Sequence, residues 1–248
     1  MEVAVLGLGE AGGRIAADLV TAGCGVRGFD PVQRPAGIVN AVSAQDAVVG
    51  ADVVLSLNAA AVALEIAAAV ADSLGSGALY ADLNTSAPEL KRHLAESVPT
   101  QFVDVALVGV VPTSGLATPA LVSGAGAERF AALFRPLGMP VEVVGERPGD
   151  AAGLKLLRSV FMKGIAAAAL ESLAAAEAAG VEPHVRADIA SVLGEPLLER
   201  LLTGSRAHAS RRVDEMRAAA VYVQQLGVEP RISAASAAWL EQLRDEPA

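Results

Sequence analysis

Apolar and polar positions follow two different patterns along the 248-residue chain. In the first half, short apolar runs of strand length are separated by alanine-rich stretches of helical length, such as GRIAADLVTAG at 13–23. This alternation is typical of βαβ units, in which helices cover both faces of a parallel sheet. The strand candidates are VAVLGL (3–8), CGVRGFD (24–30), ADVVLSL (51–57), GALYADL (77–83) and TQFVDVAL (100–107).

From about residue 150 the strand signals stop and the pattern becomes helical, over 149–179, after Pro183, over 210–226 and over 230–243. Two breaks, at 180–183 and 227–230, both read Gly-Val-Glu-Pro, in which the glycine ends one helix and the proline begins the next. Their flanks do not match, which favours a shared connector over an internal repeat. We therefore predict an α/β fold: a doubly wound sheet over residues 1–148, then a small all-helical domain over 149–248 that a long interdomain helix introduces.

Composition narrows the functional classes. Apolar residues make up 53% of the chain, but no uncharged apolar run reaches the roughly 18 residues of a membrane span, so we expect no membrane segment. No basic segment precedes an apolar stretch at the N-terminus, which favours a cytoplasmic location. The single cysteine, Cys24, excludes an internal disulfide, and no Cys/His cluster has metal-ligand spacing. The net charge of −9 disfavours nucleic acid as a partner.

A glycine motif follows the first predicted strand. It has the form GxGxxG at a strand-to-helix turn, where glycines allow a tight turn and bring backbone N–H groups close to a pyrophosphate at the positive end of a helix. This placement predicts a dinucleotide-binding Rossmann domain. The motif consists of Gly7, Leu8, Gly9, Glu10, Ala11 and Gly12.

Asp30 ends the next predicted strand, 23 residues after Gly7. A carboxylate there suits an adenosine ribose and favours NAD as the cofactor. Two alternatives remain open. Asp30 is also an ordinary turn residue before Pro31, and Arg27 and Arg34 lie near enough in sequence to bind the 2′-phosphate of NADP.

Four segments in order resemble the β-hydroxyacid dehydrogenase family, which includes 3-hydroxyisobutyrate and 6-phosphogluconate dehydrogenases. They are GLGEAGGRIAADL, ADLNTSAP, FVDVALVGVVP and GLKLLRS, and the later SRRVDEMRAAAVYVQQLGVEP resembles a short helical domain of a poorly characterised branch. The resemblance implies a Rossmann domain followed by a helical domain, with active sites formed between the domains and usually within dimers. A homodimer is therefore expected.

The resemblance also implies roles for particular residues. The cofactor would contact Gly7 to Gly12, Asp30, Leu57, Asn58, Asn84 and Thr85, although the last two also suit turns and caps. The substrate loop corresponds to Val108, Gly109 and Val110, where the family commonly has Ser-Gly-Gly. The catalytic lysine corresponds to Lys155, and Ser159 stands where an asparagine is common. These departures indicate a substrate different from that of the well-known members.

Lysine is rare in the chain, with three against sixteen arginines. Oxidation of an alcohol needs a group that takes the proton from its oxygen, and lysine can do so whereas arginine stays protonated. Lys155, Ser159 and Lys163 form an i, i+4, i+8 row on the predicted long helix. Lys155 would be the general acid/base, Ser159 would hydrogen-bond the reacting oxygen or the substrate, and Lys163 would hold an anionic tail. Solvated surface lysines and a serine bonded to its own helix are the alternatives.

These observations favour an NAD(P)-dependent oxidoreductase that acts on a small hydroxy acid or related alcohol. An imine reductase on a similar scaffold is the nearest rival, although such relatives generally have an acid or a tyrosine where Lys155 stands. A dinucleotide-binding sensor without turnover is the second alternative. His93, His184 and His208 are expected at the surface, as are Arg211 and Arg212 in solvated ion pairs unless they reach a substrate. Trp239 is expected to pack the last helix onto the core or a partner.

Overall fold

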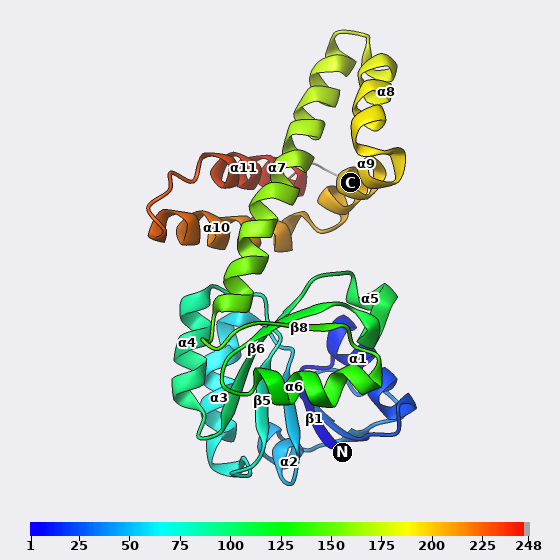
Figure 1. Ribbon diagram of the computed structural model, residues 1–248. Coiled ribbons are helices and arrows are strands. Elements are labelled where there is room, and N and C mark those ends of the chain that lie inside the picture. Colours follow the sequence, from blue (N-terminus) through cyan, green and yellow to red (C-terminus); the bar gives the residue numbers. More distant parts are fainter. Residues whose placement is uncertain (246–248) are drawn as a thin grey trace. The chain divides into compact units, whose positions relative to one another are not determined.

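The computed structural model describes residues 1–245 and divides the chain into two compact units, of which the first is Met1–Lys155 and the second begins at Leu156. The first unit holds one mixed sheet (Figure 1), and its strand order is β3-β2-β1-β4-β5-β6-β7-β8. The strand order reverses direction at β1, which confirms the predicted doubly wound sheet. The strands are β1 (Glu2–Leu6), β2 (Gly25–Phe29), β3 (Val39–Asn40), β4 (Val53–Ser56), β5 (Leu79–Asp82), β6 (Gln101–Leu107), β7 (Ala120–Ser123) and β8 (Val141–Gly145).

Helices cover both faces of this sheet, as the apolar pattern predicted. One face packs against α1 (Glu10–Thr21) and α6 (Ala127–Phe134), and the other against α2 (Ala44–Val48), α3 (Ala63–Val70) and α4 (Pro88–Ser97). The first face buries Val3 and Val5, while Ala4 and Leu6 of the same strand point to the second. The remaining short helices are α5 (Val111–Ser114), η1 (Ala60–Val62), η2 (Ala71–Ser73), η3 (Gly115–Ala117) and η4 (Arg135–Leu137).

The structure differs from the sequence prediction at β7, which pairs antiparallel to β6 through Ala106 opposite Leu121. A parallel connection needs a crossover, usually through a helix long enough to pass over the sheet. Between Leu107 and Ala120 the chain forms only the one-turn helices α5 and η3, so it reverses direction instead. The strands β3, β7 and β8 were not predicted: β3 has only two residues, and β7 and β8 follow this reversal.

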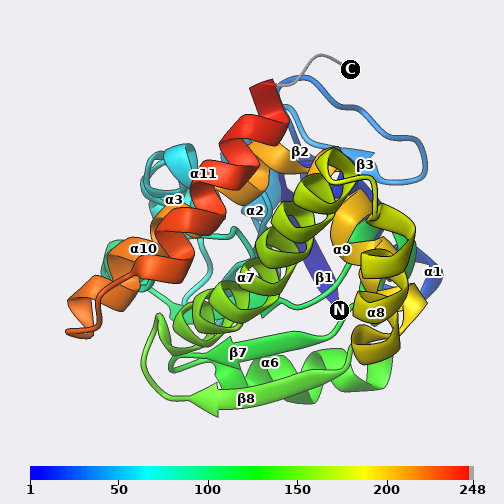
Figure 2. The ribbon, with the colours of Figure 1, turned by 90° about the horizontal axis from the view of Figure 1, so that it is seen from above.

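The second unit is helical, as predicted. After α7 (Asp150–Ala178), which begins in the first unit, come α8 (Glu182–Leu193), α9 (Glu195–Ala207), α10 (Ala209–Gln225) and α11 (Arg231–Asp245). Helices α10 and α11 lie side by side (Figure 2) and enclose one apolar cluster with Leu156. A second cluster joins α7 to α9, and Trp239 packs against it while its Nε1 donates to Glu171 Oε2 at 2.9 Å. The expected packing of Trp239 onto the core is confirmed.

Helix α7 has two properties that bear on the predictions. Its first turn belongs to the first unit, so the contacts divide the chain at residues 155/156, inside the helix, whereas the sequence placed the boundary at 148/149, where the helix starts. Among the described residues, α7 is also long and apolar enough to cross a membrane by length and composition alone. Core helices of soluble proteins pass the same test. The sequence criterion missed this helix because it required an uncharged run.

Candidate functional site

The glycine motif requires its glycines at two positions. Gly7 has φ +97°, and a Cβ there would lie 2.5 Å from the Leu57 carbonyl oxygen. At Gly12 a Cβ would lie 1.9 Å from the Gly7 carbonyl oxygen. Since real side chains do not tolerate such approaches, the backbone of Leu57 and the turn at Gly7 lock the loop in the shape that the motif predicted.

Gly9 is different, because a Cβ built there meets no atom within 4 Å. Gly9 is the N-cap of α1, its φ is −62°, and no side chain caps this helix end. The N-terminus of α1 therefore presents backbone N–H groups and the positive end of the helix dipole to open space. This open, glycine-lined helix end fits the pyrophosphate of a dinucleotide.

Asp30 lies beside this loop. Its Oδ2 accepts a hydrogen bond from Leu8 N at 2.9 Å, and its Oδ1 accepts from Val32 N and Gln33 N at 2.9 Å each. Burial would raise the pKa of this carboxyl, but the three N–H donors and the charge of Arg34 outweigh it and lower the pKa. The carboxylate thus supports its turn and also lies at the end of β2, so both interpretations of Asp30 agree with its contacts.

The two arginines near Asp30 have separate partners. Arg27 Nη2 pairs with Asp46 Oδ1 at 2.7 Å, which engages its guanidinium within the fold. Arg34 donates to the Asp30 carbonyl, and its guanidinium lies 5.8 Å from the centre of the Phe29 ring. Of the two candidates for a 2′-phosphate, Arg34 is the one that lies against the end of β2.

Asn58, Asn84, Thr85 and Lys155 come together at the carboxyl edge of β4 and β5. Asn84 Nδ2 donates to Asn58 Oδ1 at 3.1 Å, and Lys155 Nζ donates to Thr85 Oγ1 at 2.8 Å. Buried Asn84 Oδ1 has no hydrogen-bond partner within residues 1–245. A buried acceptor without a partner fits a ligand that supplies a donor, as the carboxamide of a nicotinamide does.

Beneath this edge lies a buried charge cluster of Asp82, Lys91 and Asp104, whose side chains are 0%, 1% and 0% exposed. Lys91 Nζ lies 2.6 Å from Asp82 Oδ2 and 3.1 Å from Asp104 Oδ1. Burial would lower the pKa of Lys91, but the charges of the two carboxylates outweigh it and raise the pKa. The ammonium is therefore kept charged between its partners.

Ser159 and Lys163 form a separate group in the second unit, with Glu215 of α10. Ser159 is 2% exposed, and its hydroxyl donates to Glu215 Oε1. Lys163 Nζ donates to the same oxygen at 2.9 Å and to Ser159 Oγ at 3.0 Å. Burial lowers the pKa of Lys163, against the opposing charge of Glu215. The structure thus gives both predicted residues a protein partner that the sequence did not suggest.

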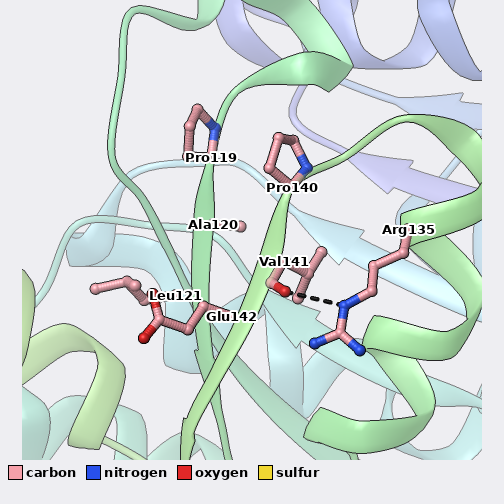
Figure 3. A pocket seen from close by; sticks show the side chains of 7 residues that line it. All are labelled: Pro119, Ala120, Leu121, Arg135, Pro140, Val141 and Glu142. Carbon is pink, nitrogen blue, oxygen red and sulfur yellow. Dashed lines mark hydrogen bonds between the residues drawn. The ribbon is translucent and has the colours of Figure 1, made fainter.

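The predicted substrate loop, Val108 to Val110, follows β6 at the same carboxyl edge. Val108 N donates to the Pro119 carbonyl at 2.8 Å, and the Val110 side chain is exposed. The surface hollow shown in Figure 3 is elsewhere, between β7 and β8, where Arg135 Nε donates to the Val141 carbonyl at 3.0 Å. Its lining includes no predicted site residue.

Comparison with protein families decides the relationship. Residues 2–138 match the family described as the NAD binding domain of 6-phosphogluconate dehydrogenase. The chain belongs to this family. Its first unit is an NAD-binding domain, which confirms the resemblance and the cofactor class that the glycine motif predicted. Residues 176–243 match a second family, described as a domain of unknown function (DUF1932), which agrees with the predicted poorly characterised branch.

Solved structures share the fold over almost the whole chain. A conserved hypothetical protein from Sinorhizobium meliloti 1021 is 29% identical, with a TM-score of 0.79 over 100% of this chain and 91% of that one. The 3-hydroxyisobutyrate dehydrogenase of Mycobacterium tuberculosis, in a structure with L-serine, is 22% identical, with a TM-score of 0.84 over 98% and 94%. An imine reductase from Myxococcus stipitatus in complex with NAD⁺ is 18% identical, with a TM-score of 0.69 over 97% and 92%. The last two show the fold alone.

Asp30 allows a test of the preference for NAD. We expect Asp30→Ser to weaken NAD binding about tenfold, because a hydrogen bond to a charged group contributes about 1.5–3 kcal/mol, and to leave NADP binding unchanged or tighter. Fluorescence titration with each dinucleotide measures this, with Arg34→Leu as the counterpart that affects NADP. Tighter binding of NADP than of NAD by the wild-type chain would contradict the ribose role of Asp30.

Proposed function

We propose that the protein is an NAD-dependent oxidoreductase that acts on a small hydroxy acid or a related alcohol, with Lys155 as general acid/base. The observation that carries this proposal is the 2.8 Å contact from Lys155 Nζ to Thr85 Oγ1, next to Asn84, at the carboxyl edge of the sheet. Ligands of doubly wound sheets bind at this edge. NADP remains the alternative cofactor.

Each part of the proposed cofactor site would bind a different part of the dinucleotide. The N-terminus of α1 with Gly9 would hold the pyrophosphate, Asp30 the adenosine ribose, and Asn58 with Asn84 the nicotinamide end. The bound dinucleotide supplies the hydride acceptor or donor. As a neutral amine, Lys155 would take the proton from the alcohol oxygen in oxidation, and as the resulting ammonium it would hydrogen-bond the carbonyl oxygen and return the proton in reduction. An arginine would orient the oxygen but could not accept the proton.

The substrate assignments extend this proposal. The loop at Val108, Gly109 and Val110 offers apolar side chains where the family commonly has a serine, so we propose a substrate with an apolar substituent at that position. Lys163 would hold an anionic tail, and Ser159 would assist through its hydroxyl. Because Glu215 Oε1 already accepts from both side chains, anion binding there requires Lys163 to exchange or share its partner.

The direct test is turnover. The purified chain is mixed with NAD and a panel of hydroxy acids that includes 3-hydroxyisobutyrate, L-serine and 6-phosphogluconate, and the absorbance of reduced nicotinamide is followed. We expect turnover with at least one small 3-hydroxy acid, and turnover at least about 100-fold slower in Lys155→Met. Dinucleotide binding without Lys155-dependent turnover across the panel would favour the sensor, a candidate that the missing loop hydroxyl supports. Reduction of cyclic imines in preference to keto acids would favour the imine reductase, whose fold this chain shares.

A cytoplasmic homodimer is part of the same proposal. Helix α7 carries an exposed apolar stripe of Leu154, Leu157 and Phe161, which are 45%, 42% and 65% exposed. These positions share one helix face. Of the most apolar 18-residue stretch of α7, only 28% is buried within the chain. A second copy that lays the same stripe against this one would cover it symmetrically.

Substitution of Phe161 tests the dimer. We expect a dimeric mass for the wild-type chain by light scattering, and for Phe161→Glu a dissociation constant raised at least about tenfold, because a buried aromatic anchor contributes 2 kcal/mol or more. The control is Val192→Glu on α8, where the side chain is 82% exposed. A monomeric wild-type chain, or one that sediments with lipid vesicles, would contradict the dimer.

A further inference from the structure

The start of α7 is capped by side chains from two strands of the sheet. Gly149, directly before the helix, has no side chain to offer the free N–H groups of the first turn. Asp104 Oδ2 of β6 accepts from Gly149 N at 3.1 Å and from Ala152 N at 2.9 Å. Ser123 Oγ of β7 accepts from Ala151 N at 3.0 Å. The backbone that leads to Lys155 is thereby fixed to the sheet one turn before the lysine.

Lys91 offsets the cost of burying the Asp104 carboxylate that caps α7. A buried carboxylate without a partner is strongly destabilising. The N-terminus of α7 stabilises the charge of Asp104, and Lys91 Nζ lies 3.1 Å from its other oxygen. The same ammonium also donates to the Asp82 carbonyl at 2.8 Å and to its carboxylate at 2.6 Å. One buried lysine therefore ties the cap of α7 to the carboxyl end of β5.

From Asp82 the contacts return to Lys155. Asp82 Oδ1 accepts from Asn84 Nδ2 at 2.6 Å, and Asn84 precedes Thr85, the residue that accepts from Lys155 Nζ. Lys155 is thus connected to the same buried charge cluster at two points. One connection runs through its backbone on α7 and the other through its Nζ. A cap that served stability alone would not need the second connection.

We propose that Asp104 and Lys91, with Ser123, are positioning residues for Lys155: they fix the first turn of α7 against the Asn84–Thr85 loop and so set the location of Lys155 Nζ. The catalytic consequence rests on the proposed function. The positioning itself is a property of the chain without any substrate, so it can be tested separately.

The chain's three lysines make that test simple. Lysine labelled with ¹³C at Cε should give three signals, and the Lys155 signal is the one lost in Lys155→Arg. In Ser123→Ala, which removes a single buried hydroxyl, and in Asp104→Asn, we expect the Lys155 signal to move toward that of a free lysine side chain. Ser236→Ala is the matched control, because Ser236 is equally buried and its hydroxyl donates to the Ile232 carbonyl within α11.

Kinetics give the second readout. We expect Ser123→Ala to lower kcat about tenfold with little change in KM or in NAD affinity, since a 1 Å misplacement of a catalytic group reduces rates by up to about 100-fold. Ser236→Ala should keep the wild-type kcat. A Lys155 signal unchanged in both folded cap variants would overturn the proposal, as would an unchanged kcat in Ser123→Ala or global unfolding of that variant. If the wild-type chain turns over no substrate, the proposed function fails, while the Lys155 signal still decides the positioning.

Discussion

Replacement of Lys155 by methionine is expected to lower kcat about 100- to 10,000-fold, the usual contribution of a general acid/base. Methionine keeps the length and the helix propensity of lysine but neither donates nor accepts a proton. The Lys155→Met chain should still fold, because the side chain is partly exposed and its hydrogen bond to Thr85 joins polar groups near the surface. NAD affinity should remain close to that of the wild type, because the glycine loop at Gly7 to Gly12 is untouched.

Two further variants distinguish proton transfer by Lys155 from a purely electrostatic role. Lys155→Arg keeps a cation at the same position, yet it should be as inactive as Lys155→Met, because a guanidinium is not deprotonated at any working pH. Arg158→Met removes an exposed cation from the same helix and should leave kcat unchanged. If Lys155→Arg retained most of the activity, Lys155 would act as an electrostatic anchor, and another group would have to move the proton.

The sequence predicted the parts of this fold that carry strong periodic signals. The strands β1, β4, β5 and β6 and the long helix α7 agree with their predicted spans to within a few residues. The two-residue strand β3 contains too little periodicity to be predicted. The strands β7 and β8 are as long as β4 and β1, and both lie beyond the reversal of direction after β6. The antiparallel pairing of β7 also depends on the length of the connection from β6 to β7. Strand and helix patterns do not show that length.

The residues of the candidate site also differ in how clearly the sequence marks them. The motif glycines, Asn84, Thr85 and Lys155 were predicted as site residues because each lies in a segment that resembles the family, and their role stays a prediction. Asp82 and Asp104 lie within the segments ADLNTSAP and FVDVALVGVVP. A charged residue inside a run otherwise typical of a buried strand is a signal that marks both of them.

Lys91 and Glu215 were harder to find. Lys91 lies in the charged stretch ELKRH, which reads as a solvated helix face, and only its partners on two strands distant in sequence explain its burial. The sequence suggested only solvated ion pairs for Arg211 and Arg212 on that helix, whereas the Glu215 carboxylate accepts from Ser159 and Lys163 of α7. Pairings across elements depend on packing, whereas local sequence shows only neighbours along one helix.

Gly9→Ala is expected to weaken NAD binding about 10- to 100-fold while the fold stays intact. The new methyl group would stand where the pyrophosphate approaches the backbone, and it would disturb one or two hydrogen bonds to a charged group, worth about 1.5–3 kcal/mol each. Within the protein a Cβ at Gly9 meets nothing within 4 Å, and φ of −62° suits alanine. Alanine is a poorer N-cap than glycine by up to about 1 kcal/mol. The reduced freedom of the unfolded chain offsets about 0.4–1 kcal/mol of that loss.

Two further glycines make the result specific. Gly75→Ala is the matched control: a Cβ there also meets nothing within 4 Å, and the residue lies in the loop before β5, away from the dinucleotide motif, so both stability and NAD affinity should be unchanged. Gly12→Ala should lower the yield of folded protein, because its Cβ would lie 1.9 Å from the Gly7 carbonyl oxygen. Calorimetry of the three variants with and without NAD distinguishes the cases. Wild-type affinity in Gly9→Ala would mean that the open helix end of α1 does not face the pyrophosphate, and the cofactor placement from Gly9 to Lys155 would have to be abandoned.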